Sequence, residues 1–193
     1  QAVGVVHTAD GRTIDFSVAL TMSRQFVEES HLEIRAGSAN KIDPLVINFD
    51  GLGVGLSQTR FAFDLDSDGT EEQIASLRPG NGYLALDRNG DGTINVGSVL
   101  FGDYTPLADG SLAKDGFEAL RALDSNADGL FDAKDDLFNL VQVWVDADHN
   151  GVNGAGELYG LVELGIQSID LNARSSDRVE NGNHYGLISK FTR

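Results

Sequence analysis

Carboxylate and amide side chains in residues 146–157 recur at the spacing of a calcium-binding loop. Asp146, Asp148 and Asn150 stand at the first, third and fifth positions, a glycine follows at the sixth, and Glu157 closes the twelve residues. This fits the pattern D-x-[DN]-x-[DN]-G-x5-E. Calcium takes six to eight oxygen ligands, so the Val152 carbonyl and both Glu157 oxygens would complete the shell. The alternative is a polar loop of Asx turns that holds no metal.

Three earlier segments repeat the pattern with departures, and we number the four as loop 1 (64–75), loop 2 (87–98), loop 3 (124–135) and loop 4 (146–157). All expected ligands are oxygen donors from acidic or amide side chains. They are Asp64, Asp66, Asp68 and Glu72 in loop 1; Asp87, Asn89, Asp91 and Asn95 in loop 2; and Asp124, Asn126, Asp128, Asp132 and Asp135 in loop 3.

These departures predict that loops 1 to 3 differ in how strongly they bind calcium. Loop 1 has Ala75 at the twelfth position, so Glu72 at the ninth must close it. Loop 2 has only two charged ligands, which predicts weaker binding. Loop 3 ends on Asp135, whose shorter side chain favours closure through one oxygen. Each loop keeps the same alternative of an Asx-rich turn without metal.

Composition limits the classes of partner. The formal net charge is −16 over 193 residues, which argues against nucleic acid or an anionic membrane. The chain has no cysteine, so a disulfide or a zinc–thiolate site is excluded. No apolar run approaches the roughly 18 residues of a transmembrane helix. The four histidines are scattered, and no Ser/His/Asp or HExxH arrangement appears.

The predicted fold class is α+β, with short strands and helices organised around several EF-hand-like calcium loops and an N-terminal β-hairpin. Alternating apolar residues around an Asp-Gly pair predict that hairpin within residues 3–20. A small-residue linker divides the chain into a hairpin segment, 1–42, and a calcium-binding module, 43–193. We expect strands at 45–49, 61–63 and 141–145, and helices over 117–123, from 137 and from 158. Loop starts 23, 37 and 22 residues apart predict two units of paired loops, 61–99 and 117–157.

Several motifs carry a resemblance to a known family. They are LFGD at 100–103, LADGS at 107–111, ALDSN at 122–126, VW at 143–144 and ELGIQSIDL at 163–171. Residues 43–193 resemble the self-processing module of bacterial repeat-in-toxin (RTX) proteins, whereas 1–42 lie outside the resemblance. The glycine-rich RTX nonapeptide repeats are absent.

The resemblance implies a secreted or surface bacterial protein, extracellular and part of a larger chain, that folds around calcium. It also implies calcium-triggered cleavage of the Asp43–Pro44 bond. In that chemistry the Asp43 carboxylate attacks its own backbone carbonyl, forms a cyclic anhydride and expels the Pro44 nitrogen. Two departures remove oxygen donors that the family usually has: residues 48–53 read NFDGLG in place of D-x-D-G-D-G, and Val99 replaces a glutamate.

Three functions therefore stand at this stage. The first is a calcium-stabilised extracellular binding module. The second is a single-turnover autoprotease acting at Asp43–Pro44, against the alternative that this dipeptide is a stiff linker. The third is an adhesion or carbohydrate-binding module that uses calcium structurally.

Overall fold

The computed structural model describes the backbone of residues 2–7, 13–18, 29–31, 34–35, 41–42, 44–180 and 183–193. Side chains are described for residues 44–177 and 185–193. Asp43 therefore lies outside the described residues, and so does the turn of the N-terminal hairpin.

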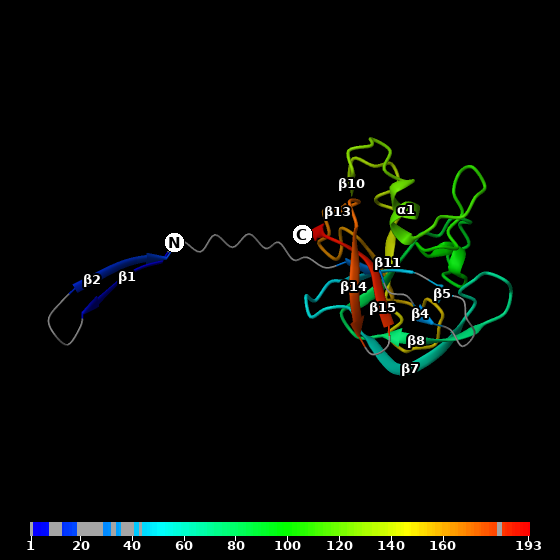
Figure 1. Cartoon of the computed structure of the whole chain (residues 1–193), viewed down its shortest axis with the longest axis horizontal. Coiled ribbons are helices and arrows are strands. Elements are labelled where there is room, and N and C mark those ends of the chain that lie inside the picture. The colour runs from blue at the N-terminus through cyan, green and yellow to red at the C-terminus, as the bar shows by residue number, and fades with distance from the viewer. Residues whose placement is uncertain are drawn as a thin grey trace.

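A seven-stranded antiparallel sheet runs through the compact part of the molecule, on the right in Figure 1, where its strands β11, β14 and β15 are labelled. Its strands, in spatial order, are β12 (Leu158–Gly160), β11 (Gln142–Trp144), β9 (Asn81–Ala85), β6 (Leu45–Asn48), β3 (Glu29–His31), β15 (Asn183–Ser189) and β14 (Arg174–Glu180). The central strands come from distant parts of the chain, so the sheet joins the two ends of the module.

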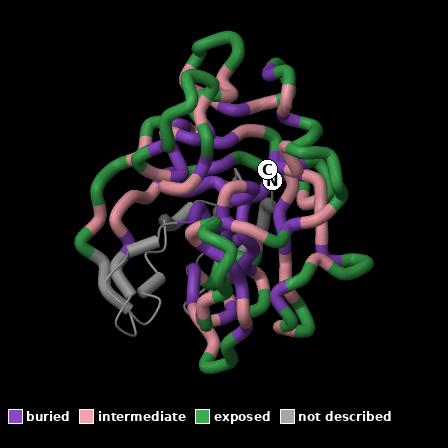
Figure 2. The backbone as a smooth tube through the Cα atoms, turned by 90° about the vertical axis from the view of Figure 1, so that its right-hand side faces the viewer, coloured by how far each residue is buried: buried purple, intermediate pink, exposed green. Residues whose placement is uncertain are grey.

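The three strands β6, β9 and β11 are buried on both faces of the sheet. Successive side chains of a strand point to opposite faces. In β6, Leu45 and Ile47 belong to one hydrophobic cluster and Val46 to the other. In β11, Val143 and Trp144 divide in the same way, and all five are fully buried. Figure 2 shows buried residues inside and exposed residues along the outer loops.

One face is covered by a short helix and a small sheet. The helix α1 (Gly116–Arg121) begins at Asp115, whose side chain accepts the Glu118 N–H at 2.8 Å. The sheet contains β10 (Leu130–Asp132), β13 (Ser168–Asp170) and β16 (Phe191–Thr192). Phe117 of α1 is 1% exposed. Phe131, at the eighth position of loop 3, is fully buried.

The opposite face is covered by the hairpin of β7 (Leu56–Phe63) and β8 (Glu72–Leu77). Its aromatic side chains pack on Trp144, whose ring centroid lies 6.0 Å from that of Phe61 and 5.4 Å from that of Phe63. Tyr83 lies 5.7 Å away on the same measure. Trp144 is fully buried, so it is a core residue and offers no platform for a sugar.

The remaining strands belong to the N-terminal part. The expected hairpin is confirmed, because β1 (Ala2–His7) pairs antiparallel with β2 (Thr13–Val18) in a sheet of its own. β4 (Ile34–Arg35) pairs with β5 (Lys41–Ile42). β3 enters the main sheet between β6 and β15. Part of the segment before residue 43 therefore completes the sheet of the module.

The predicted α+β class is wrong: the described chain is mostly β-strand, with α1 and one 3-10 turn, η1 (Gly97–Val99), as its helices. No helix in the described ranges is long and apolar enough to cross a membrane. The expected strands at 45–49, 61–63 and 141–145 are confirmed, and so is the helix near 117.

The helices expected after loops 3 and 4 do not form. Residues 158–160 pair with β11 instead, because Glu157 O accepts the Val145 N–H at 2.8 Å and starts a ladder. Glycines at 156, 160 and 165 also disfavour a helix there. Residues 136–140 make turns, and Leu140 is 59% exposed. The loops therefore join strands and short turns, and an EF-hand arrangement of paired helices is absent from the described chain.

A substitution of Gly97 tests the contact between η1 and loop 1. An added Cβ would lie 1.7 Å from the Leu65 backbone oxygen, where only backbone movement can relieve the clash. We expect Gly97→Ala to lower the free energy of unfolding by about 1–3 kcal/mol or more, measured by urea denaturation. Gly160→Ala is the control, since its Cβ would meet no atom within 4 Å. Equal stability of the two variants would contradict this packing.

Candidate metal centres

All four loops share one backbone conformation. The fourth position has a positive φ in each: 59° at Ser67, 73° at Gly90, 56° at Ala127 and 62° at His149. The sixth position is a glycine with φ of 89°, 79°, 83° and 76° in the same order. A positive φ is uncommon for residues other than glycine. The repetition therefore shows that the four sequences form the same turn, although the elements around them differ.

The first-position carboxylate receives the glycine N–H in every loop. The distances are 3.0 Å to Asp64, 2.8 Å to Asp87, 3.0 Å to Asp124 and 3.1 Å to Asp146. Further Asx-type bonds join third- and fifth-position side chains to the following amides. These bonds explain the shape of the loops with or without a metal, so the metal question depends on how closely the acidic oxygens converge.

Loop 4 brings three carboxylates together. One oxygen each from Asp146, Asp148 and Glu157 lie within 4.8 Å of one another. Asn150 lies beside them and donates its amide to Asp148 at 2.8 Å. Val152 is 55% exposed at the outer side of the turn. The set consists of hard oxygen donors, which suits calcium or magnesium better than a soft metal.

The buried Glu157 and the half-buried Asp146 of loop 4 differ in their electrostatics. For Glu157 burial acts to raise the pKa, but N–H groups from Gly154, Ala147 and Asp148 outweigh it and leave the pKa below its ordinary value. Burial raises the pKa of Asp146, and the Glu157 charge adds to this effect. Asp146 is therefore the acid of this pair whose charge is poorly compensated by the protein.

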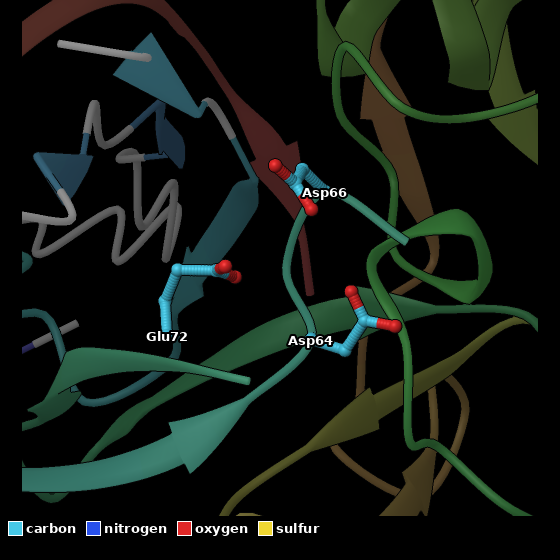
Figure 3. A group of neighbouring side chains, drawn as sticks. All are labelled: Asp64, Asp66 and Glu72. Carbon is cyan, nitrogen blue, oxygen red and sulfur yellow. The ribbon is translucent and has the colours of Figure 1, made fainter. Parts of the chain in front are cut away.

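Loop 1 forms a second group of three. Oxygens of Asp64, Asp66 and Glu72 lie within 4.8 Å of one another, and Figure 3 shows Glu72 reaching from β8 toward the loop. Glu72 also accepts the Leu65 N–H at 3.0 Å. Asp68 instead accepts the Thr70 N–H at 2.7 Å. Glu72 thus stands where the sequence requires a closing carboxylate at the ninth position.

Loop 2 has the weaker donor set expected of it. Asp87 accepts the N–H groups of Gly90 and Gly92, both at 2.8 Å. The Asn89 amide donates to Asp91 at 2.6 Å, so an internal donor already satisfies this carboxylate. The structure shows no contact that would bring Asn95 into the loop's group of oxygens.

A lysine side chain forms ion pairs with two aspartates of loop 3. Lys134 Nζ lies 3.1 Å from both Asp128 and Asp132, at the fifth and ninth positions. Asp135 is buried, 3% exposed, and accepts the N–H groups of Ser125 at 2.8 Å and Asp132 at 2.9 Å. Asn126 and Asp124 complete the turn. Among the described residues, neither loop 2 nor loop 3 brings three carboxylates within 4.8 Å.

Loops 1, 2 and 4 are joined to one another, whereas loop 3 lies with β10 and β13. The Gly97 N–H at the end of loop 2 donates to the Asp64 carbonyl at 2.8 Å. The Asn153 side chain of loop 4 accepts the Ile94 N–H at 2.8 Å and donates to the Gly92 carbonyl at 3.0 Å. The predicted contact between loops 1 and 2 is confirmed, but loop 4 also bonds to loop 2, so the described loops do not separate into the two predicted units.

Asn153 is a residue that sequence reasoning missed. It occupies the eighth position of loop 4, where loops 2 and 3 carry the apolar Ile94 and Phe131. A polar residue at this position was the available signal. Its side chain is used for a contact between two loops rather than for the core.

Of the two residues at the expected cleavage site, the structure describes only Pro44. Asp43 lies outside the described residues, so its geometry is not part of the site. Pro44 is buried directly before β6, and the next amide, of Leu45, donates to the Phe101 carbonyl at 2.6 Å. The chain is thus firmly held on the proline side of that bond.

Glu157 provides a test of loop 4 in the presence of a chelator. Its lowered pKa means that ionised Glu157 stabilises the fold above the pKa of the unfolded chain, and this contribution is lost as the pH falls through the folded value. Glu157→Gln should lower the free energy of unfolding at neutral pH by about 1–3 kcal/mol, because buried N–H groups lose an acceptor. The difference from the native chain should shrink in acid, as followed by urea denaturation at several pH values.

Glu163→Gln is the matched control, since Glu163 is exposed and accepts one N–H at 3.3 Å. A Glu157→Gln chain with native stability at neutral pH would contradict the assigned hydrogen bonds.

Comparison with known proteins gives a family model and several curated relatives that match this chain. The chain is 39% identical over 164 residues to the iron-regulated protein FrpA of Neisseria meningitidis serogroup C. The alignment covers 82% of this chain and 15% of FrpA, so the chain spans only a small part of the length of that relative. The model of the SPM domain family matches residues 45–193. On that match, the chain belongs to the SPM domain family.

Proposed function

We propose that this chain is a calcium-binding module of a secreted or surface bacterial RTX-like protein, folding and gaining stability when calcium binds. The observation that carries the proposal is the convergence of Asp146, Asp148 and Glu157 within 4.8 Å, in a turn whose conformation recurs in three other loops. FrpA, the relative at 39% identity, is an RTX-type protein, which supports the same assignment.

The donor chemistry explains why an ion would stabilise the fold. Converging carboxylates repel one another, and the chain carries a formal charge of −16. Calcium in all four loops would add eight positive charges and bring this to −8. Each ion that binds only the folded chain adds RT ln(1 + [L]/Kd), about 2.7 kcal/mol when calcium is at 100 times Kd. The loops with three converging carboxylates, loops 1 and 4, should bind most tightly.

The biological setting follows from the same chemistry. Extracellular calcium is abundant, so an acidic module of this kind would be completed outside the cell. The small share of FrpA that is aligned fits a module within a longer chain. Its partners are calcium ions and, in this proposal, the other domains of that chain.

Asp146→Asn tests the proposal. The variant keeps an oxygen that can accept the Gly151 N–H but removes the charge. By calorimetry we expect it to bind one calcium equivalent fewer than the native chain. The fluorescence of Trp144, two residues away and the single tryptophan, should also respond less to calcium. In the native chain the melting temperature should rise between chelator and millimolar calcium.

The matched control is Asp109→Asn, in an exposed turn outside the four loops, where Asp109 accepts the Ser111 N–H at 2.9 Å. It should bind as many ions as the native chain. A native melting temperature that is equal in chelator and calcium would refute the proposal. An unchanged ion count in Asp146→Asn would remove loop 4 from it.

A second candidate function is calcium-triggered self-cleavage at Asp43–Pro44 through an aspartyl anhydride. The observation in its favour is the fixed proline side of the bond, where Pro44 is buried and Leu45 is bonded to Phe101. Restricting one side of a bond lowers the entropy cost of bringing an attacking group to it. The leaving nitrogen of Pro44 would still need a proton donor.

Intact-mass measurement separates the two functions. If self-cleavage occurs, millimolar calcium should release a fragment that begins at Pro44, and Asp43→Asn should abolish it while leaving calcium binding unchanged. A native chain that stays at full mass after prolonged exposure to calcium, while its melting temperature rises, would leave the binding function alone standing.

A further inference from the structure

Residues 48–53 form a fifth turn with the conformation of the four loops. Counted from Asn48, the fourth and sixth positions are Gly51 and Gly53, with φ of 77° and 89°. Asn48 Oδ1 accepts the N–H groups of both glycines, at 3.0 and 3.2 Å. The third-position Asp50 accepts the Leu52 N–H at 2.8 Å. The backbone therefore follows the same course as in loops 1 to 4.

The side chains of this turn do not fit a cation. The first position is a neutral amide, and the fifth is Leu52, which is 88% exposed. Only Asp50 remains as a charged donor. A hard cation binds through several oxygens, so one carboxylate is a poor site.

The side-chain amide of Asn48 donates its N–H groups to oxygens in and beside this turn. The two backbone donors fix the orientation of the Asn48 amide, because its oxygen must face them. Its Nδ2 then donates to Asp50 Oδ1 at 2.8 Å and to Asn81 Oδ1 at 3.0 Å, with the Gly80 carbonyl at 3.4 Å. Asn48 is 2% and Asn81 3% exposed, so water does not compete for the bond between them, whereas Asp50 lies at the surface.

Asn81 is itself held in place. Its Nδ2 donates to the Arg78 carbonyl at 3.0 Å and to the Pro79 carbonyl at 3.3 Å. The Phe49 N–H donates to the Gly80 carbonyl at 2.9 Å. The turn therefore docks on residues 78–81 and ties the end of β6 to the start of β9.

We propose that residues 48–53 are an ion-independent counterpart of the calcium loops, closed by the Asn48 amide where a bound cation would otherwise join the oxygens. This turn takes up no calcium, and in the folded chain its hydrogen bonds hold β6 against β9 without an ion. The junction of β6 and β9 thus needs no ion of its own. Calcium then acts on loops 1, 2 and 4 and not on this turn, whose Phe49 lines the same cavity as Asp146 and His149 of loop 4.

Asn48→Asp isolates the amide donor, since the carboxylate still accepts from both glycines but cannot donate to Asp50. We would measure amide hydrogen exchange in the full chain, with chelator and with millimolar calcium. At a temperature where the native chain is folded in chelator, Gly51 and Gly53 should exchange by local opening at the same rate, within about twofold, in both conditions. In Asn48→Asp with chelator, both should exchange at least about tenfold faster, because two carboxylates face each other without a counter-charge.

Asn172→Asp is the matched control. Asn172 is exposed and its amide donates to Asp170 at 3.0 Å, so the same charge change occurs on the surface. It should leave Gly51 and Gly53 unchanged. A native chain in which calcium slows Gly51 and Gly53 as much as Gly151, or an Asn48→Asp chain with native exchange in chelator, would overturn the inference.

Only the comparison with loop 4 rests on the proposed function. If Gly151 exchanges at the same rate with and without calcium, calcium binding by loop 4 fails. The chelator measurement on Asn48→Asp still decides the role of the Asn48 amide in that case.

Discussion

Converging carboxylates repel one another, and the whole structure depends on how each turn compensates that repulsion. In loop 4, three backbone N–H groups surround Glu157, yet Asp146 remains poorly compensated. In loop 3 the ammonium of Lys134 bridges two aspartates, and in loop 2 the Asn89 amide satisfies Asp91. The same turn thus occurs with different partners for its negative charge. The need for an added cation is greatest where the protein supplies the least, which is why loops 1 and 4 lead the proposal.

The sheet determines which of these turns can influence one another. Trp144 packs on Phe61 and Phe63 under loop 1, and the chain that carries it enters loop 4 two residues later. Asn153 then joins loop 4 to loop 2 through two hydrogen bonds. These three loops therefore form one connected region on one face. Loop 3 lies on the other face, where its Phe131 is buried in the cluster that includes Leu45 and Val143.

The conformation of the four turns was predictable from the sequence, and less of the architecture was. The D-x-[DN]-x-[DN]-G spacing located four turns, since the fixed glycine and the first-position carboxylate are local requirements. Helices were expected after loops 3 and 4 because Leu137, Leu140 and Leu158, Leu161 recur at helical spacing. Pairing of residue 158 with β11 overrode that local signal. The hydrogen bonds from Asn153 to loop 2 join segments far apart in sequence, and so does the bond from Asn48 to Asn81. No local pattern encodes such contacts.

The position of the ion-independent turn limits how calcium can act on the start of the module. Pro44 precedes β6, whose far end is closed by Asn48, Asn81 and Asp50 without a metal. A calcium effect can reach the start of β6 by two routes. One runs from the end of loop 2 to Leu45, whose N–H donates to the Phe101 carbonyl at 2.6 Å. The other runs from loop 4 through β11 and β9 to β6. That second path is rigid, because a Cβ on Gly82 would lie 2.4 Å from Val143 and 2.8 Å from the Trp144 carbonyl. If calcium orders loop 4 as proposed, the order can reach Pro44 through the close contact of β9 and β11, whereas the turn at the far end of β6 responds only indirectly.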